Sequence, residues 1–160
     1  MKKILTFTAL SLSLFAGDIM SSKMISTEFA LDIAKSALTE CRSNGYQVSV
    51  VIVDRAGNVQ VSLRDVYASR FTTEIATRKA NTVILSGVDS GIFRKNREDI
   101  RQELNHIDGI IVMEGGLPIE AAGTLVGAIG VSGAPGGDKD AACARTALQS
   151  VSERLIFASE

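Results

Sequence analysis

Three carboxylates stand where the sequence predicts strand ends and could act as general acids or bases: Asp54, Asp65 and Glu114. Carboxylates at such positions also cap hairpins and turns, and capping is the simpler interpretation. The single histidine, His106, lies in a charged stretch, and no GxSxG motif supplies a nucleophile for a Ser/His/Asp relay. Ser132 lies in VSGAP, which is a different motif. The sequence therefore contains no catalytic constellation, although Asp54 and Glu114 stay open as candidate bases.

A glycine-rich turn leads into the last predicted helix, where unpaired backbone N–H groups could bind a phosphate. The chain contains neither GxxxxGKS/T nor GxGxxG, and Asp138 and Asp140 place negative charge where a phosphate would lie. Helix capping is therefore favoured over nucleotide binding. The two cysteines, Cys41 and Cys143, lack the spacing of a zinc or thioredoxin-type site. In an exported protein they could form a disulfide, and otherwise they could be buried thiols.

The hydrophobic pattern predicts the elements that would position these residues. A first helix begins at a cap formed by Ser26 or Thr27 and ends at Asn44-Gly45. The pattern then predicts strands over 48–53 and 59–64 joined as a hairpin, a helix over 72–85, a short exposed helix within 93–105, a buried strand over 110–113, a turn at 115–116, extended residues 117–119, a strand over 125–131 and a last helix over 138–158. The short links predict an α+β fold with a mainly antiparallel sheet.

Glycine is concentrated in the later part of the chain, where nine of the 14 glycines lie between Gly109 and Gly137. Glycine in a strand packs nothing and costs stability, so its recurrence at 127, 130 and 133 predicts backbone that approaches something closely. The approaching group could be a ligand, another subunit or a neighbouring helix. Our functional interpretation is that this segment admits a flat ligand or a sister chain.

The composition is that of one soluble globular domain, with 46% hydrophobic and 22% charged residues. Lys2 and Lys3 precede an apolar run over 4–16, which predicts a signal peptide over residues 1–22 and a single domain over 23–160. The run is too short to span a membrane. We expect a periplasmic or secreted protein, or a cytoplasmic one if the leader is not cleaved. A net charge of −1 gives no attraction to nucleic acid or to an anionic membrane.

Several segments together resemble the GlcG/HbpS family of haem-binding proteins, which is related to the C-terminal domain of PduO-type corrinoid adenosyltransferases. They are VVIVDRAGNV at 50–59, Arg64 with Ala68 downstream, the Lys79-Ala80 pair, GGLPI at 115–119 and GTLVGAIGVSGAPGGDKDAACA at 123–144. The resemblance covers nearly all of the chain after the leader. It implies a profilin-like domain in which helices pack on both faces of an antiparallel five-stranded sheet. It also implies haem as the ligand and assembly into a homo-oligomer.

The resemblance and the chemistry of haem together select candidate site residues. Haem requires a flat apolar slot, cations for two propionates and an axial donor. Arg64 and Lys79 could hold the propionates, and Tyr67 or His106 could bind the iron, with Met113 as a weaker donor. Some relatives use a histidine near the first helix, which residues 24–46 lack. The other predicted cofactor contacts lie in the glycine-rich signature: Gly115, Gly116, Pro118, Ser132 and Gly133.

The sequence thus supports three hypotheses. The first is an exported haem-binding protein without catalytic activity that sequesters, delivers or senses haem as an oligomer. The second is a small-molecule enzyme, or an accessory domain in glycolate or corrinoid metabolism, with Asp54 or Glu114 as the base. The third is a ligand-free interaction module whose glycines permit close packing of subunits.

Overall fold

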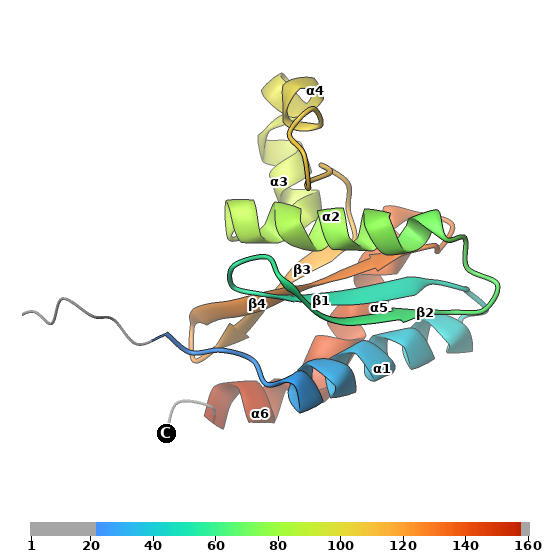
Figure 1. Cartoon of the computed structure of the whole chain (residues 1–160), viewed down its shortest axis with the longest axis vertical. Helices are drawn as coiled ribbons and strands as arrows, with labels where there is room; N and C mark the ends of the chain where they lie inside the picture. The colour runs from blue at the N-terminus through green and yellow to red at the C-terminus, as the bar shows by residue number, and fades with distance from the viewer. Residues whose placement is uncertain (1–21, 158–160) are drawn as a thin grey trace, which may run out of the picture.

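The protein, described by a computed structural model over residues 22–157, is an antiparallel sheet between helices (Figure 1). The sheet has four strands in the order β2-β1-β4-β3. They are β1 (Ser49–Asp54), β2 (Val59–Arg64), β3 (Gly116–Ala121) and β4 (Thr124–Ser132). The helices are α1 (Thr27–Ser43), α2 (Phe71–Ser86), α3 (Ser90–Asn96), the 3-10 helix η1 (Glu98–Ile100), α4 (Arg101–Leu104), α5 (Gly137–Ser150) and α6 (Ser152–Phe157). The predicted leader, apart from Ser22, lies outside the described residues.

Helices cover both faces of the sheet, which confirms the predicted α+β class. Strand β1 is buried at all six positions, because its alternate side chains enter two separate cores. Val50 and Ile52 pack with α1 and α5, whereas Val51 and Val53 pack under α2. Figure 1 shows α2 above the sheet and α1 below it.

The helices α1 and α5 are joined covalently. Ser26 caps α1 by accepting a hydrogen bond from the Phe29 N–H, as the sequence predicts. The Cys41 side chain, on the buried face of α1, forms a disulfide with Cys143 of α5, with the two Cα atoms 5.4 Å apart. The pairing that the sequence left open is therefore formed in this structure. Among the described helices, none is long and apolar enough to cross a membrane.

The predicted strand over 110–113 is wrong, and the sheet has four strands rather than the five implied by the resemblance. Side chains hold this segment in place of a strand ladder. The Ile111 N–H donates to Thr82 Oγ1 at 3.1 Å, and the Val112 N–H donates to Asn105 Oδ1 at 2.8 Å. Buried apolar residues here pack beside α2 without pairing to a strand, so a short hydrophobic run predicted burial correctly and conformation incorrectly.

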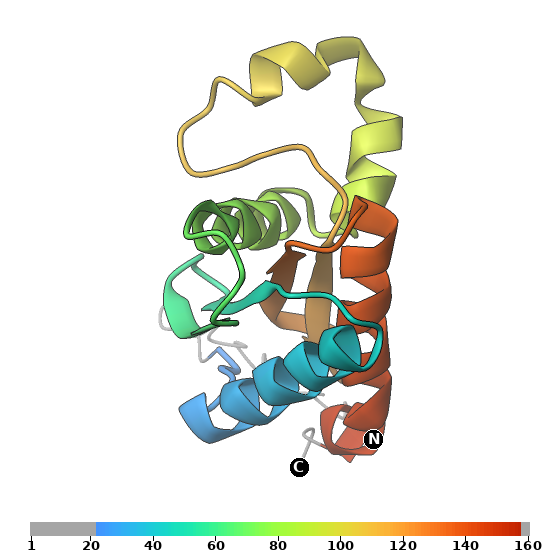
Figure 2. The ribbon, with the colours of Figure 1, turned by 90° about the vertical axis from the view of Figure 1, so that its right-hand side faces the viewer.

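Two further elements differ from the sequence prediction. The last helix breaks at Val151, which separates α5 from α6. The charged stretch over 93–105 is helical as predicted, but it forms α3, η1 and α4 in succession. Figure 2 shows this segment projecting from the end of α2, away from the sheet. The projection creates a second region of surface, remote from α6.

Candidate functional site

The glycine-rich segment lies against the backbone of its own chain. A Cβ on Gly130 would overlap the carbonyl oxygen of Ala76 in α2, and one on Gly116 would overlap that of Lys79. Gly127 approaches β1 in the same way. These glycines let helix α2 and strand β1 reach the backbone of β3 and β4. The prediction that this backbone approaches something closely is therefore confirmed. The approaching groups belong to helix α2 and strand β1 of the same chain, rather than to a ligand or a sister chain.

The other residues of the signature do not gather around a cavity. Ser132 is buried at the end of β4, Pro118 is half-buried in β3, and Gly133 is exposed just after β4. Gly115 and Gly116 are buried. None of these five residues lines the cavities described below.

Lys79 lies inside the protein, with 1% of its surface exposed. Its Nζ donates to Asp140 Oδ2 at 2.7 Å and to the Val131 carbonyl oxygen at 2.9 Å. Burial raises the pKa of Asp140 above its ordinary value, and the charge of Lys79 opposes that rise. Gly115 makes room for the ammonium, because a Cβ there would lie 2.7 Å from Nζ. Lys79 therefore joins α2 to α5 and does not stand at a surface where a propionate could meet it.

Arg64 and Tyr67 belong to a tightly held loop after β2. The Arg64 Nη1 donates to the carbonyl oxygens of Asp65 at 3.1 Å and of Ala68 at 2.6 Å. Buried Asp65 pairs in turn with Arg42. Tyr67, in contrast, is 86% exposed and lines none of the cavities described here. The hydrogen-bonded loop thus presents Tyr67 to solvent, and the Arg64 guanidinium, which was predicted to bind a propionate, holds the backbone of the loop instead.

His106 and Met113, the other predicted donors, flank the two ends of one loop. Asn105 Oδ1 accepts the Val112 N–H at 2.8 Å, which ties one end of the loop to the other. Both side chains are exposed. Neither His106 nor Met113 lines the apolar cavity described below. Among the described residues, no group of three His, Cys, Asp or Glu is arranged to hold a metal.

Asp54 is a turn cap, as the simpler interpretation predicts. Its carboxylate accepts the N–H groups of Ala56 at 2.8 Å and of Asn58 at 2.9 Å, and also the Asn58 side chain at 3.0 Å. Burial raises the Asp54 pKa, but the hydrogen bonds outweigh burial and hold the pKa below its ordinary value. A carboxylate with a lowered pKa is a weak general base at neutral pH. Glu114, the other candidate base, lines a charged cavity beside α3.

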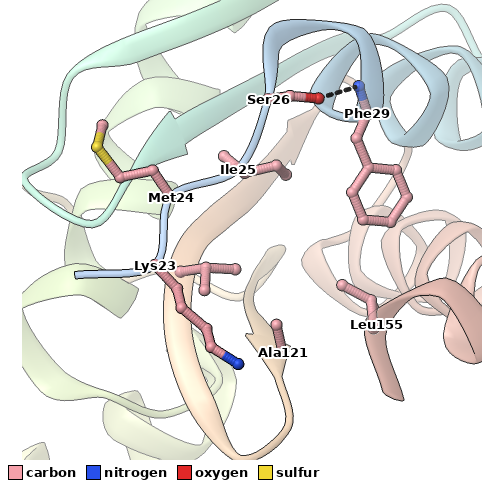
Figure 3. Close-up of a pocket in the computed structure, with 8 residues that line it drawn as sticks. Lys23, Met24, Ile25, Ser26, Phe29, Ala121 and Leu155 are labelled. Carbon is pink, nitrogen blue, oxygen red and sulfur yellow. Dashed lines mark hydrogen bonds between the residues drawn. The ribbon is translucent and has the colours of Figure 1, made fainter. Parts of the chain in front are cut away.

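An apolar cavity of about 320 Å³ opens where four elements meet: the segment before α1, the first turn of α1, the β3–β4 hairpin and α6. It is lined by Lys23, Met24, Ile25, Ser26, Phe29, Ala121, Val126 and Leu155. Figure 3 shows Phe29 and Leu155 pointing toward one another, with the Met24 side chain turned away from both. Arg154 stacks on the Phe29 ring, with its guanidinium carbon 4.1 Å from the ring centre. The cavity therefore has hydrophobic walls and one cationic side chain, Lys23, in its lining.

Met24 separates this cavity from a neighbouring one. The second cavity has a volume of about 290 Å³ and is lined by Ser22, Met24, Asp54, Arg55 and Ala56. Met24 belongs to both linings, so the apolar cavity adjoins a cavity that has a cation, Arg55, in its lining. Together the two cavities offer apolar surface and two cations, Lys23 and Arg55, to a flat molecule with carboxylates, with the Asp54 carboxylate beside Arg55 in the second lining.

Sequence reasoning did not predict this site. Lys23 and Met24 directly follow the predicted leader, and they carry no motif. Phe29 and Leu155 lie in segments that were predicted as helices, which is correct, but the contact between the two segments depends on packing between the two ends of the described chain. The exposed apolar Met24 before an N-cap was the one local signal.

Comparisons with known proteins identify relatives along most of the chain. The family model described as "Haem degrading protein HbpS-like" matches residues 25–149. The crystal structure of a double mutant of HbpS from Streptomyces reticuli is 32% identical, covers 90% of this chain and 98% of that chain, and has a TM-score of 0.79. A second HbpS crystal structure is 34% identical over 88% of this chain and 99% of that chain, also with a TM-score of 0.79.

A more distant neighbour shares the fold. The crystal structure of a PduOC:Heme complex is 23% identical, covers 80% of this chain and 95% of that chain, and has a TM-score of 0.70. The search among curated proteins found no match.

Proposed function

The chain belongs to the HbpS-like family, and on that premise we propose that it binds haem, or a closely related tetrapyrrole, in the apolar cavity beside Phe29. The observation that carries the proposal is the cavity itself. Its volume of about 320 Å³ lies within the range of small-molecule sites, roughly 300–1,000 Å³. The description of the family names haem, and the PduOC neighbour was solved in complex with heme.

The lining residues fit the ring and a carboxylate of haem better than they fit its iron. Ile25, Phe29 and Leu155 offer apolar surface to a porphyrin edge. Lys23 and, in the adjoining cavity, Arg55 could pair with the propionates. No histidine, tyrosine or cysteine lines the cavity. The Met24 thioether is the sulfur donor of the lining, and because its side chain is turned away from Phe29 and Leu155 (Figure 3), it could bind the iron only after rotation of this exposed side chain. Haem held there would supply a redox-active iron.

Tyr67 and His106 would be ligands only for a haem placed elsewhere on the molecule, since neither lines the cavity. Their replacement therefore provides a test of position. Tyr67→Phe and His106→Ala should leave the haem spectrum unchanged, whereas Met24→Leu should keep the affinity and shift the Soret band.

The biological role that we propose is sequestration, delivery or sensing of haem outside the cytoplasm. Two features support export. The predicted leader has the pattern of a secretory signal, and a disulfide such as Cys41–Cys143 is characteristic of oxidising compartments. Detection of the mature chain in a periplasmic or culture fraction, with its N-terminus near residue 23, would support this part of the proposal. A cytoplasmic chain that retains residues 1–22 would contradict it.

Assembly into a homo-oligomer is part of the proposal and rests on the loop after β2. Val66 and Tyr67 are more than four-fifths exposed, and nearby Phe71 is 57% exposed. The hydrogen bonds of Arg64 fix the loop that carries them. Exposed bulky side chains on a rigid loop are typical of interface anchors, because little conformational entropy is lost on binding. A Tyr67→Ser variant should shift the mass measured by light scattering toward the monomer, and an unchanged mass would contradict this role.

Titration of the purified protein with haemin tests the central proposal. The wild type should give a saturable Soret shift. Met24→Glu places a carboxylate at the apolar cavity and should weaken binding at least about tenfold, since burying a charge or polar group there costs over 1 kcal/mol. Leu85→Glu is the matched control, because Leu85 is a similarly exposed apolar residue on α2, outside the cavity lining. Equal affinity for all three proteins would rule out the cavity.

A further inference from the structure

A second cavity, of different chemistry, lies in the projecting segment. It has a volume of about 270 Å³ and is lined by Gly91, Arg94, Lys95, Glu98, Arg101 and Glu114. Five of these six residues carry a charge, in contrast to the apolar lining beside Phe29. Figure 1 shows α3 and α4 at the opposite end of the molecule from α6. The two cavities are therefore separate sites.

The charged groups of this cavity are not used to hold the fold. Among the residues that the structure describes, none of the five makes an ion pair or a side-chain hydrogen bond. Neighbouring charges are paired outside the cavity: Arg97 with Asp99, and Arg145 with Asp89. Charges on a convex surface are usually just solvated. Here three cations and two carboxylates line one concave site without forming ion pairs with one another; Arg94, Lys95 and Glu98 are exposed, and Arg101 and Glu114 are half-buried.

Gly91 contributes to the shape of the cavity. A Cβ at this position would lie 2.9 Å from Glu114 Cγ and 3.0 Å from Glu114 Cδ. The absence of a side chain at Gly91 therefore lets the Glu114 side chain lie against α3, where it forms one wall of the cavity. Glu98 and Glu114 supply negative charge beside the cationic Arg94, Lys95 and Arg101.

We propose that this cavity binds a small amino-dicarboxylate, a molecule with two carboxylates and one ammonium group. The cations Arg94, Lys95 and Arg101 would pair with the carboxylates, and guanidinium groups are suited to bind carboxylates in a bidentate manner. Glu98 and Glu114 would accept hydrogen bonds from the ammonium. The lining carries a net charge of +3 − 2 = +1, which such a ligand, with net charge −1, neutralises. The charged lining, in contrast to the apolar lining beside Phe29, does not offer the flat apolar slot that a tetrapyrrole ring requires.

Calorimetric titration with three probes tests both the charge and the composition of the ligand. L-glutamate carries both kinds of group, succinate lacks the ammonium, and 1,4-diaminobutane lacks the carboxylates. Glutamate should bind most tightly, succinate roughly tenfold more weakly for the lost charged hydrogen bonds, and the diamine not measurably. The proposal is overturned if glutamate shows no saturable binding up to about 10 mM. Even a dissociation constant of about 1 mM corresponds to a binding free energy of only about 4 kcal/mol, so this limit is generous. It is also overturned if the diamine binds as well as glutamate.

Variants assign the binding to this cavity. Arg101→Gln should weaken glutamate at least about tenfold, whereas Arg97→Gln, which removes a charge of the same segment outside the lining, should leave it unchanged. Glu114→Gln should reduce the preference for glutamate over succinate. Haemin affinity should be the same in Arg101→Gln and wild type. A fall in haemin affinity would mean that the cavity holds propionates, and equal effects of the two arginine changes would indicate nonspecific attraction; either outcome overturns the proposal.

Discussion

Replacement of Gly130 by alanine tests how the sheet and α2 fit together. Gly130 pairs with Val51 of β1 and with Gly116 of β3. An added Cβ would overlap the Ala76 carbonyl oxygen and lie 2.8 Å from the carbonyl carbon, whereas unbonded carbon atoms prefer about 3.5–4.0 Å. It would also lie 3.0 Å from the Ala80 nitrogen. Helix α2 would therefore have to rise from the sheet by on the order of 1 Å.

Such a displacement opens the core between α2 and the sheet, which is formed by Val51, Val53, Ala76, Ala80, Val83 and Ala128. Overpacking of a core costs about 1–3 kcal/mol and occasionally more. We expect the free energy of unfolding to fall by at least about 3 kcal/mol, because a clash with backbone cannot be relieved by a rotamer change. Urea denaturation followed by circular dichroism measures this loss. Adding Ala76→Gly to Gly130→Ala should restore nothing, since the overlapping oxygen belongs to the backbone.

Gly91→Ala is the matched control for Gly130→Ala. A Cβ at Gly91 meets the flexible Glu114 side chain, which can move, and alanine favours a helix by about 1 kcal/mol over glycine. Its stability should stay within about 1 kcal/mol of the wild type. A Gly130→Ala variant with the same urea midpoint of unfolding as the wild type, but without haem binding or oligomer assembly, would contradict this explanation of Gly130. In that case the glycine would serve an external partner.

Three other predictions concern charges and the disulfide. Replacing both Cys41 and Cys143 by alanine should lower the unfolding free energy by roughly 4–5 kcal/mol, because the bond spans a separation of 102 residues; an unchanged melting temperature would contradict this. Lys79→Met should cost about 3–5 kcal/mol by leaving Asp140 buried and unpaired, and Lys79→Met with Asp140→Asn should cost less in urea denaturation. Because the folded-state pKa of Asp54 is lowered, its stabilising effect is complete above the unfolded pKa of about 3.9 and is lost as the pH falls through the folded pKa. The stability difference between wild type and Asp54→Asn should therefore shrink in acid, and a difference that grows in acid would refute the assignment.

The sequence predicted those elements whose periodicity is supported by local caps. The first helix has Ser26 as its cap and Asn44-Gly45 as its end, and the structure confirms both. The prediction of a strand over 110–113 was wrong because an apolar run of four residues is too short to distinguish a strand from buried irregular structure. Its backbone N–H groups donate to the side chains of Thr82, 29 residues away, and of Asn105, seven residues away, and no local rule predicts these side-chain hydrogen bonds.

Prediction of the candidate site failed for a different physical reason. Recurring glycines in a strand indicate that another group approaches the backbone closely, but the sequence does not say whether that group is a helix of the same chain or a ligand. In the structure, the group that approaches Gly130 is the backbone of Ala76 in α2. Lysine is usually exposed, so the burial of Lys79 against Asp140 was not expected from its type. The apolar cavity depends on contact between the first and last helices, which local patterns do not encode.

Paramagnetic broadening of NMR signals by ferric haem tests the proposed site most directly. Resonances of residues close to the bound iron lose intensity when haemin is added. With haem in the apolar cavity, the losses should centre on Met24, Phe29, Ala121 and Leu155, and Arg94 to Arg101 should keep their intensity. Losses centred on Tyr67, on His106 and Met113, or spread evenly over the molecule would contradict haem binding in the apolar cavity.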